Sequence, residues 1–341
     1  MHTPRILQCA GAFVAVAIVS ACATNSPAVP QGAGLNASYV GKMLFLNGRP
    51  TTAAGLNPLP SYSRLVPLKK SMSKDYEYIF NTYGTYAGIF DYPKSAAMIG
   101  KIKGLGGQGC TNVLYGYGKG IFWNAGRTNN LITEYKVGSN KVLKTLSLSY
   151  MYTSSCAMNT SGDIAIGVLL GNSSYGGQVA VFKNASGSGT VYQTPLGEEY
   201  FDGYDPSGNL FADGFALGGS GSFMLVELPK GSSKAIAIKT SNSPEFPGSV
   251  QWDGTYLTVF DQRKTETYRY AVSGTTATLK NTITYSGAGD CAQTWLVKGL
   301  MYCGDYSDNQ GLVYGYPGGG APIATFSGDF DGPLGVTAAK K

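Results

Sequence analysis

A repeat of about 44 residues runs through most of the chain and constrains its fold more than any other feature. Each copy has a turn, usually with glycine, and then a short apolar run, as in Gly162-Asp163-Ile164-Ala165-Ile166. One position of the run marks each copy: Tyr78, Ile121, Ile164, Leu210, Tyr256 and Leu300. The spacings between these positions are 43, 43, 46, 46 and 44 residues. An apolar run bounded by glycine turns is typical of a β-strand, so the repeating unit is rich in strands.

The rest of each copy reads as further strands. A second strand commonly ends in an aromatic residue, as in Thr133-Glu134-Tyr135, and an outer strand such as Val142–Leu146 follows after a turn. An inner strand precedes each later landmark, at residues 110–116, 156–160, 202–206, 249–253 and 291–297. Four strands within 40–50 residues is the unit of a β-propeller blade.

The six landmark positions predict six blades, but an inner strand precedes only the last five of them in the sequence. The segment 332–338 supplies the sixth, beside strands near 77–82, 87–92 and 98–103. Such a closure removes an exposed sheet edge and locks the ring. We therefore expect an all-β, six-bladed β-propeller with four-stranded blades over residues 61–341. In the alternative, residues 61–67 add a strand and give seven irregular blades.

The amino-acid composition suits a fold of many strands and excludes several kinds of catalytic and metal site. The chain of 341 residues has 48 Gly and 24 Tyr, and 13% of its residues are charged, a balance opposite to that of disordered chains. Its one histidine is His2, in a segment that we expect to be removed. A mature chain without imidazole excludes Ser-His-Asp catalysis, Cys-His catalysis and histidine zinc sites.

The first residues read as an export signal. Arg5 precedes an apolar run, Cys9–Ala21, that is too short to span a membrane and fits a signal peptide over residues 1–21. The run ends in Val19-Ser20-Ala21-Cys22, which resembles the bacterial lipobox, so Cys22 is the expected lipidation site. Ordinary cleavage near Ala21 is the alternative. Residues 22–60 read as a flexible tether. We expect an extracytoplasmic lipoprotein monomer on the outer membrane or cell surface.

Four cysteines remain after Cys9 and Cys22 are set aside. An even number of cysteines in an exported chain suggests disulfide bonds. Cys291 and Cys303 flank one hairpin, while Cys110 and Cys156 occupy equivalent places in successive inner strands. We predict the pairs Cys291–Cys303 and Cys110–Cys156. A catalytic thiol is disfavoured, because no histidine is present to lower its pKa.

The propeller scheme separates the charges between the two ends of the ring. The acids predicted on one face are Glu198, Glu199, Asp202, Asp213, Glu245, Asp261, Asp290, Asp305, Asp308 and Asp331. The lysines predicted on the opposite face are Lys94, Lys119, Lys141, Lys230, Lys234 and Lys298. The acidic face is therefore the expected ligand face.

Within that face, polar residues recur at the end of the strand that contains each landmark. Asn81, Asn124 and Asp213 share one repeat position, with Asp261 and Asp305 two residues further along. Converging carboxylates could hold Ca²⁺ or another divalent cation, with Asp213, Asp261 and Asp305 as the metal candidates, or attract a cationic ligand. In the alternative, Asp and Asn occupy these turns for backbone reasons alone.

Further ligand-face candidates are Asp202, Asp290 and the aromatic residues Trp123, Tyr200 and Tyr306. Aromatic rings beside polar groups suit sugar or peptide contacts, while packing between blades is the alternative. The sequence argues against nucleic acid as a partner, because the lysines are scattered and the protein is expected to lie outside the cytoplasm.

Two segments resemble the repeats of NHL and gluconolactonase-like propellers: Cys156–Ile166 and Tyr204–Asp213. The segment Gly332-Pro333-Leu334-Gly335-Val336 is similar to the start of an inner strand in that superfamily, and the resemblance covers about residues 75–339. It implies a propeller and, in the lactonases, an axial divalent metal held by a Glu, an Asn and an Asp. That ligand set has no residue-by-residue match here.

Two functions follow as expectations. The first is a non-catalytic binding module whose acidic, aromatic-rich face takes a protein, glycan or small-molecule ligand. The alternative is a metal-dependent, lactonase-like hydrolase with an axial site of the Ca²⁺ type. A purely structural envelope protein is a third possibility. Fold alone does not decide among them.

Overall fold

A computed structural model describes the following parts of the chain: residues 65–67, 75–81, 86–126, 130–148, 153–169, 176–217 and 221–341. All of them belong to one unit, Asn47–Lys341. The predicted signal peptide, Cys22 and the tether lie outside the described residues. The secondary structure of the described part is strands, apart from a 3-10 turn, η2 (Lys183–Ala185). No helix in these ranges is long and apolar enough to cross a membrane.

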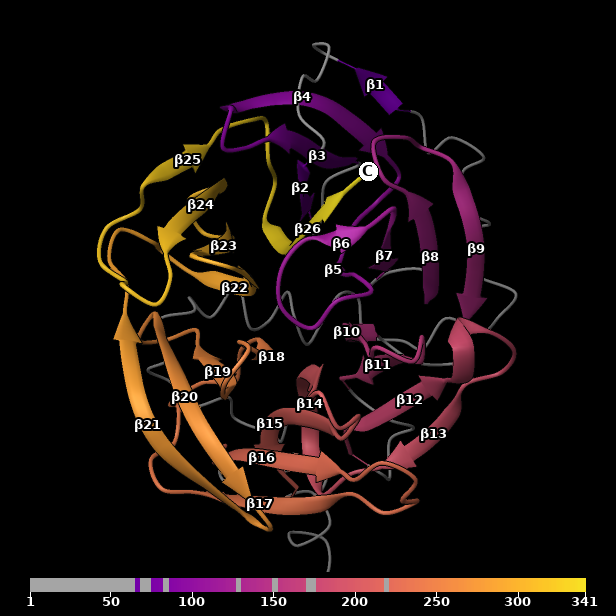
Figure 1. The fold of residues 1–341 in the computed structure, drawn as a ribbon, viewed down its shortest axis with the longest axis vertical. Coiled ribbons are helices and arrows are strands. Elements are labelled where there is room, and N and C mark those ends of the chain that lie inside the picture. Colours follow the sequence, from indigo (N-terminus) through magenta and orange to yellow (C-terminus); the bar gives the residue numbers. More distant parts are fainter. Residues whose placement is uncertain are drawn as a thin grey trace, which may run out of the picture. The chain divides into compact units, whose positions relative to one another are not determined.

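The strands form small sheets in a propeller-like arrangement around a common centre (Figure 1). Three of the sheets have four antiparallel strands each. In order, they are β5 (Gln108–Cys110), β7 (Ile121–Ala125), β8 (Leu131–Lys136) and β9 (Val142–Ser147); β10 (Thr153–Met158), β11 (Ile164–Val168), β12 (Gln178–Phe182) and β13 (Thr190–Gln193); and β22 (Cys291–Val297), β23 (Leu300–Asp305), β24 (Gln310–Gly315) and β25 (Ala324–Phe326). The prediction of small four-stranded sheets is confirmed.

The largest sheet has eight strands and contains two antiparallel runs of four. They are β14 (Leu196–Tyr204), β15 (Leu210–Ala216), β16 (Phe223–Leu228) and β17 (Ile236–Thr240), and β18 (Val250–Trp252), β19 (Leu257–Asp261), β20 (Glu266–Ser273) and β21 (Thr276–Thr284). The outer strands β17 and β21 pair in parallel, with Lys239 opposite Thr276. Two units that the sequence predicts as separate therefore share one sheet, because their unpaired outer edges meet at the rim.

The remaining sheet has six strands and joins distant parts of the chain. In order, they are β1 (Leu65–Pro67), β4 (Ser95–Lys103), β3 (Tyr86–Asp91), β2 (Asp75–Asn81), β26 (Pro333–Lys340) and β6 (Gly118–Lys119). β26 is antiparallel to β2, with Tyr78 opposite Thr337. β1 extends the outer edge of β4, so residues 65–67 do not begin a sheet of their own.

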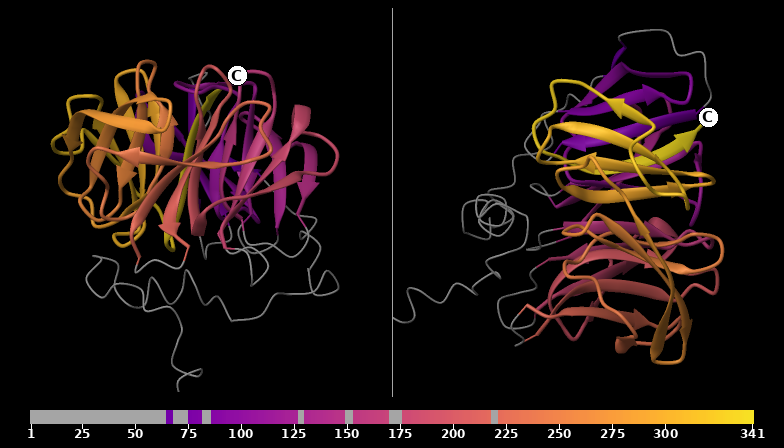
Figure 2. Two further views of the ribbon diagram at one scale, coloured as in Figure 1. Left: turned by 90° about the horizontal axis from the view of Figure 1, so that it is seen from below. Right: turned by 90° about the vertical axis from the view of Figure 1, so that its left-hand side faces the viewer.

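Burial decreases from the centre to the rim, and this gradient explains the apolar repeat. Every residue of the inner strands β10 and β22 is buried, whereas most of the outer strand β9 is exposed. The strands of each unit run between the two ends of the ring (Figure 2). The turns between first and second strands use glycines with positive φ, such as Gly162 at 91° and Gly208 at 87°. Other residues rarely adopt this backbone conformation, which is why glycine recurs there.

Side chains of the inner strands tie neighbouring sheets together. The Gln251 amide accepts a hydrogen bond from Leu296 N at 2.8 Å and donates one to Leu296 O at 3.2 Å. The Gln293 carbonyl accepts from Gly109 N at 3.1 Å and from Val336 N at 2.9 Å. The inner strands are therefore linked through side-chain amides that reach the backbone of the next sheet.

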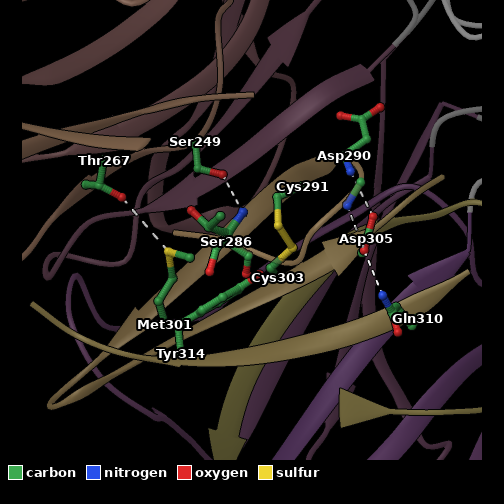
Figure 3. The surroundings of a disulfide bond; sticks show 12 residues. Ser249, Thr267, Ser286, Asp290, Cys291, Met301, Cys303, Asp305, Gln310 and Tyr314 are labelled. Carbon is green, nitrogen blue, oxygen red and sulfur yellow. Dashed lines mark hydrogen bonds between the residues drawn. A yellow bond between two sulfur atoms is a disulfide. The ribbon is translucent and has the colours of Figure 1, made fainter. Parts of the chain in front are cut away.

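Both predicted disulfides are confirmed. Cys110 of β5 is bonded to Cys156 of β10, which links two neighbouring sheets across 46 residues of sequence. Cys291 and Cys303 are bonded within the sheet of β22 and β23, across 12 residues (Figure 3). The first bond restricts a much longer loop of the unfolded chain than the second.

Removing the Cys110–Cys156 bond is therefore expected to cost more stability than removing the Cys291–Cys303 bond. Loop-closure entropy gives about 4 kcal/mol for the first and about 3 kcal/mol for the second. Urea unfolding of the two paired Cys→Ala variants checks this order. A larger loss for Cys291→Ala/Cys303→Ala would contradict it.

Candidate functional site

The polar residues at the ends of the second strands hold the adjoining loops. Asp261, at the end of β19, accepts hydrogen bonds from four backbone N–H groups; those of Glu245 and Arg263 lie at 2.6 and 2.9 Å. Asp213 of β15 accepts from Phe201 N at 3.2 Å and Gly248 N at 3.0 Å. These carboxylates are aimed at the loops that lead into inner strands.

Asp305 and Asn124 serve their loops in the same way. Asp305 of β23 accepts from Asp290 N at 2.9 Å and from the Gln310 side chain at 3.0 Å (Figure 3). Asn124 of β7 is an amide, and it donates to Gly106 O and Gln108 O, which precede or begin β5. At this repeat position, a carboxylate accepts hydrogen bonds where the loop offers N–H groups, and an amide donates them where the loop offers carbonyl groups. This is what we expect if Asp and Asn occupy these positions for backbone reasons.

The predicted metal set is not brought together in this arrangement. Asp213, Asp261 and Asp305 each bind the backbone of their own neighbourhood. Across the described residues, no group of three or more His, Cys, Asp or Glu side chains is placed to hold a metal ion. The sequence pattern located these carboxylates correctly on the strands, but it did not show that loop N–H groups occupy their oxygens.

Asp202 differs from the repeat-position carboxylates. It lies on the inner strand β14 and is 5% exposed, and its carboxylate has no charged partner and no backbone partner from another residue in the described part of the chain; the Ser155 hydroxyl is its polar neighbour. Burial raises its pKa to about 7, although the Ser155 hydroxyl lowers it. A buried carboxylate that lacks a charged partner is costly, so its presence needs an explanation.

Glu199 lies three residues before Asp202 on β14 and is fully buried. The Ser154 and Ser155 hydroxyls donate hydrogen bonds to its carboxylate. Burial, and next the charge of Asp202, raise the pKa of Glu199 well above its usual range. Gly167 leaves room for this carboxylate, since a Cβ at that position would collide with it. The two acids thus form a buried pair, and no lysine or arginine side chain from the described residues forms an ion pair with either.

Asp202 and Ser155 line a narrow axial cavity of about 30 Å³ between the inner strands. Residues from β10, β14, β18 and β22 contribute to its wall, among them Gln251 and Trp295. A cavity of this size holds roughly two water molecules. It can therefore take an ion or an ammonium-sized group, and a sugar ring would not fit.

The segment Thr111–Tyr117 crosses one end of the axis. The sequence predicts an inner strand over 110–116, but β5 ends at Cys110 and the chain leaves the sheet before β6. Gly116 N donates to Leu296 O at 3.1 Å, and the Trp295 indole donates to Gly116 O at 3.1 Å. Leu114 O accepts from Gln251 at 3.0 Å and Leu114 lines the cavity. The extra length between β5 and β7, compared with other repeats, is the signal that sequence reasoning missed.

The other acidic candidate, Asp290, precedes β22 and is 4% exposed, and its Oδ1 atom has no partner among the described residues. Its carboxylate points away from Asp305, which binds its backbone (Figure 3). Burial raises the pKa of Asp290 to about 8, and the nearby charge of Asp305 adds to this effect. Asn81 pairs through its backbone with Pro333, and its side chain lies outside the described part.

The three aromatic candidates differ in how deeply their side chains are buried. Trp123 of β7 is fully buried in a core cluster, which is the packing alternative considered for these residues. Tyr200 is 4% exposed and packs edge-on against Phe215 and Phe246, with centroids 5.4 and 5.5 Å away. Tyr306 is half-buried and its ring lies against Gly332.

Another buried acid, Glu77 of β2, connects its own sheet with Tyr302 of β23 and with the segment Thr111–Tyr117 at the other end of the ring. Its Oε1 accepts hydrogen bonds from the Tyr117 and Tyr302 hydroxyls, both at 3.2 Å, and its Oε2 accepts from Tyr92 N at 2.8 Å. The two hydroxyls also contact each other at 2.6 Å. Burial raises the pKa of Glu77 from 4.5 to about 8 against these hydrogen bonds, which lower it.

Comparison with known proteins identifies the architecture alone. No family model and no curated protein matches the sequence. A solved chain from a nidogen/laminin complex matches with a TM-score of 0.59 and 11% identity, over 78% of this chain and 98% of that one. A functionally unknown protein from Desulfotomaculum acetoxidans matches with a TM-score of 0.54 and 8% identity, over 78% and 99%. These similarities support a β-propeller-like fold.

The repeat-position carboxylates predict a specific loss of stability. Asp261→Ala leaves four loop N–H groups without their acceptor and is expected to cost about 2–3 kcal/mol of unfolding free energy. Asp308→Ala, at an exposed carboxylate, should stay within about 0.5 kcal/mol of the parent. Urea unfolding measures both, and equal effects of the two substitutions would contradict the assignment.

Glu77 predicts a pH dependence of stability. Because its pKa is higher in the folded state than in the unfolded state, the stability that Glu77 contributes is fully present below about pH 4.5 and is lost as the pH rises towards 8. One such group contributes about 1.4 kcal/mol per pH unit within that window. Glu77→Gln should therefore flatten the profile by that amount when unfolding is measured between pH 5 and 8. An unchanged slope would show that Glu77 ionises freely in the fold.

Proposed function

We propose that the chain is a closed, six-bladed β-propeller that serves as a non-catalytic binding module. The four-stranded antiparallel runs, including β4-β3-β2-β26, correspond one to one with the sequence repeats, which supports six blades with β26 completing the first. The similarity to other solved propeller-like chains supports the same assignment. A propeller supplies a rigid ring whose ends carry variable loops, and such rigid scaffolds commonly position binding sites.

The ligand end of this module is the one at which β15, β19 and β23 end. Five acids lie at or towards this end, namely Glu199, Asp213, Asp261, Asp290 and Asp305, and a sixth, Asp202, lies further along β14. None of the six forms an ion pair with a described lysine or arginine. Burial raises the pKa values of several of them, and a positively charged ligand would favour their ionised forms.

The observation that carries the proposal is Asp202, an acid among the residues that line the axial cavity, whose buried carboxylate has the Ser155 hydroxyl beside it and no positively charged partner among the described residues. A cation placed against it would pair with its carboxylate and offset the charge of neighbouring Glu199. Since Thr111–Tyr117 lies across the opposite end, the ligand would enter from the acidic end. The cavity size favours a small cationic group, such as a lysine ammonium presented by a protein partner.

The cell surface is the proposed location, with the module anchored through Cys22. The support for this is the Val19-Ser20-Ala21-Cys22 segment behind an apolar run. A tether over residues 22–60 would let the ring reach a partner at some distance from the membrane. The matched chain belongs to a complex of two proteins, nidogen and laminin, and a protein partner is the analogous proposal here.

Thermal unfolding of the full chain at pH 8, with methylammonium or with K⁺ as the probe, tests the ligand proposal. A probe at 100 times its dissociation constant adds about 2.7 kcal/mol of stability. We expect methylammonium to raise the unfolding temperature of the parent and of Asp308→Asn, an exposed acid near the same end. Asp202→Asn should abolish the rise. The absence of any rise, or an equal rise in Asp202→Asn, would overturn the proposal.

A further inference from the structure

Five exposed lysines gather where the C-terminal strand meets β6 and the turn between β8 and β9. We call Lys119, Lys136, Lys141, Lys340 and Lys341 the lysine cluster. Lys340 and Lys119 lie opposite each other on the parallel strands β26 and β6. The Lys341 side chain lies against Gly138, which stands in the turn between Lys136 and Lys141. Figure 1 shows the end of β26 beside these elements.

The cluster is not neutralised by the surrounding fold. None of its members forms an ion pair with a residue that the structure describes. One acid, Asp75 on β2, lies opposite Lys340 of β26 in the antiparallel pairing of these strands. Like charges directly opposite each other on paired strands are destabilising, and Lys119 and Lys340 are such a pair. The strand contacts themselves are made by the backbone, as in the hydrogen bond from Gly120 N to Lys340 O at 2.7 Å.

Apolar side chains are exposed at the same place. Val142 and Leu143 follow Lys141 directly and are 40% and 44% exposed. Val191 and Ile323 are also exposed, at the corresponding start of the outer strands β13 and β25. Exposed apolar residues beside lysines are the composition of surfaces that bind anionic lipid, since the lysines meet the headgroups and the apolar groups enter the interface.

We propose that the lysine cluster, together with Val142 and Leu143, docks on an anionic lipid bilayer. Because β26 and β8 both end at this side of the ring, docking would turn the opposite, acidic end away from the membrane. The inference rests on the lysine cluster around β26 and on the exposed Val142 and Leu143. It depends neither on a ligand at Asp202 nor on lipidation of Cys22, and it can fail while the proposed function stands.

Vesicle co-sedimentation of the full chain provides the test. Vesicles of phosphatidylcholine alone are compared with vesicles that also contain phosphatidylglycerol. The apolar segment Cys9–Ala21 contributes similarly to binding of both vesicle types. The difference in affinity between the two therefore measures the electrostatic contribution to binding. Each lysine near an anionic surface contributes about a factor of five in affinity, so Lys119→Gln/Lys136→Gln/Lys141→Gln should weaken this part about a hundredfold. High salt should weaken it as well.

The matched control is Lys103→Gln/Lys239→Gln/Lys280→Gln, which removes three exposed lysines outside the cluster and should leave binding nearly unchanged. Val142→Ser/Leu143→Ser should weaken binding while the salt dependence remains. Equal losses in the two lysine triples would overturn the proposal, as would equal binding to both vesicle types. Binding of soluble polyphosphate without binding of phosphatidylglycerol vesicles would also overturn it, because the partner would then be a polyanion other than a bilayer.

Discussion

The antiparallel pairing of β2 with β26 is the constraint on which the other features depend. It joins Asp75 to Lys340 and Phe80 to Gly335, and so brings the two ends of the described chain into one sheet. Without this ladder, both strands would present unpaired edges. The same pairing places Val336 N against Gln293 and Lys340 against Lys119, so both the axial contacts and the lysine cluster depend on it.

The inner strands show how the fold treats buried polar groups. Gln251, Gln293 and the repeat-position residues Asp213, Asp261 and Asp305 are all engaged with backbone groups. Each of them stabilises a neighbouring strand or loop, because an unpaired backbone group in this interior would cost as much as a lost hydrogen bond. Asp202 is the contrast, since it is a lining residue of the cavity and its carboxylate holds no loop or neighbouring strand among the described residues. This difference separates a ligand candidate from structural acids of the same residue type.

The sequence predicts the repetitive part of the structure well. The repeat is marked by residues such as Ile164 and Leu210, each with a glycine shortly before it. These residues lie in strands that are buried between neighbouring sheets, so their spacing predicts the strands correctly. The pairs Cys110–Cys156 and Cys291–Cys303 follow from their places in that repeat. The sequence does not predict where a side chain points once its strand ends. Asp261 faces loop N–H groups and Trp123 faces the core for reasons that depend on loop conformation and sheet packing. The departure of Thr111–Tyr117 from the expected inner strand has the same origin, since its partners lie in sheets far away in sequence.

A titration of the Asp202 carboxyl carbon by NMR tests the central claim, that this group is buried beside the axial cavity and has no positively charged partner. The structure predicts an apparent midpoint of about 7 for the free protein, shared with the neighbouring Glu199, because burial disfavours the charged form. Addition of a binding cation should shift this midpoint downwards, since the cation favours the ionised carboxylate. A midpoint near 4 in the free protein would contradict the account, because it would mean that Asp202 is solvated or already paired.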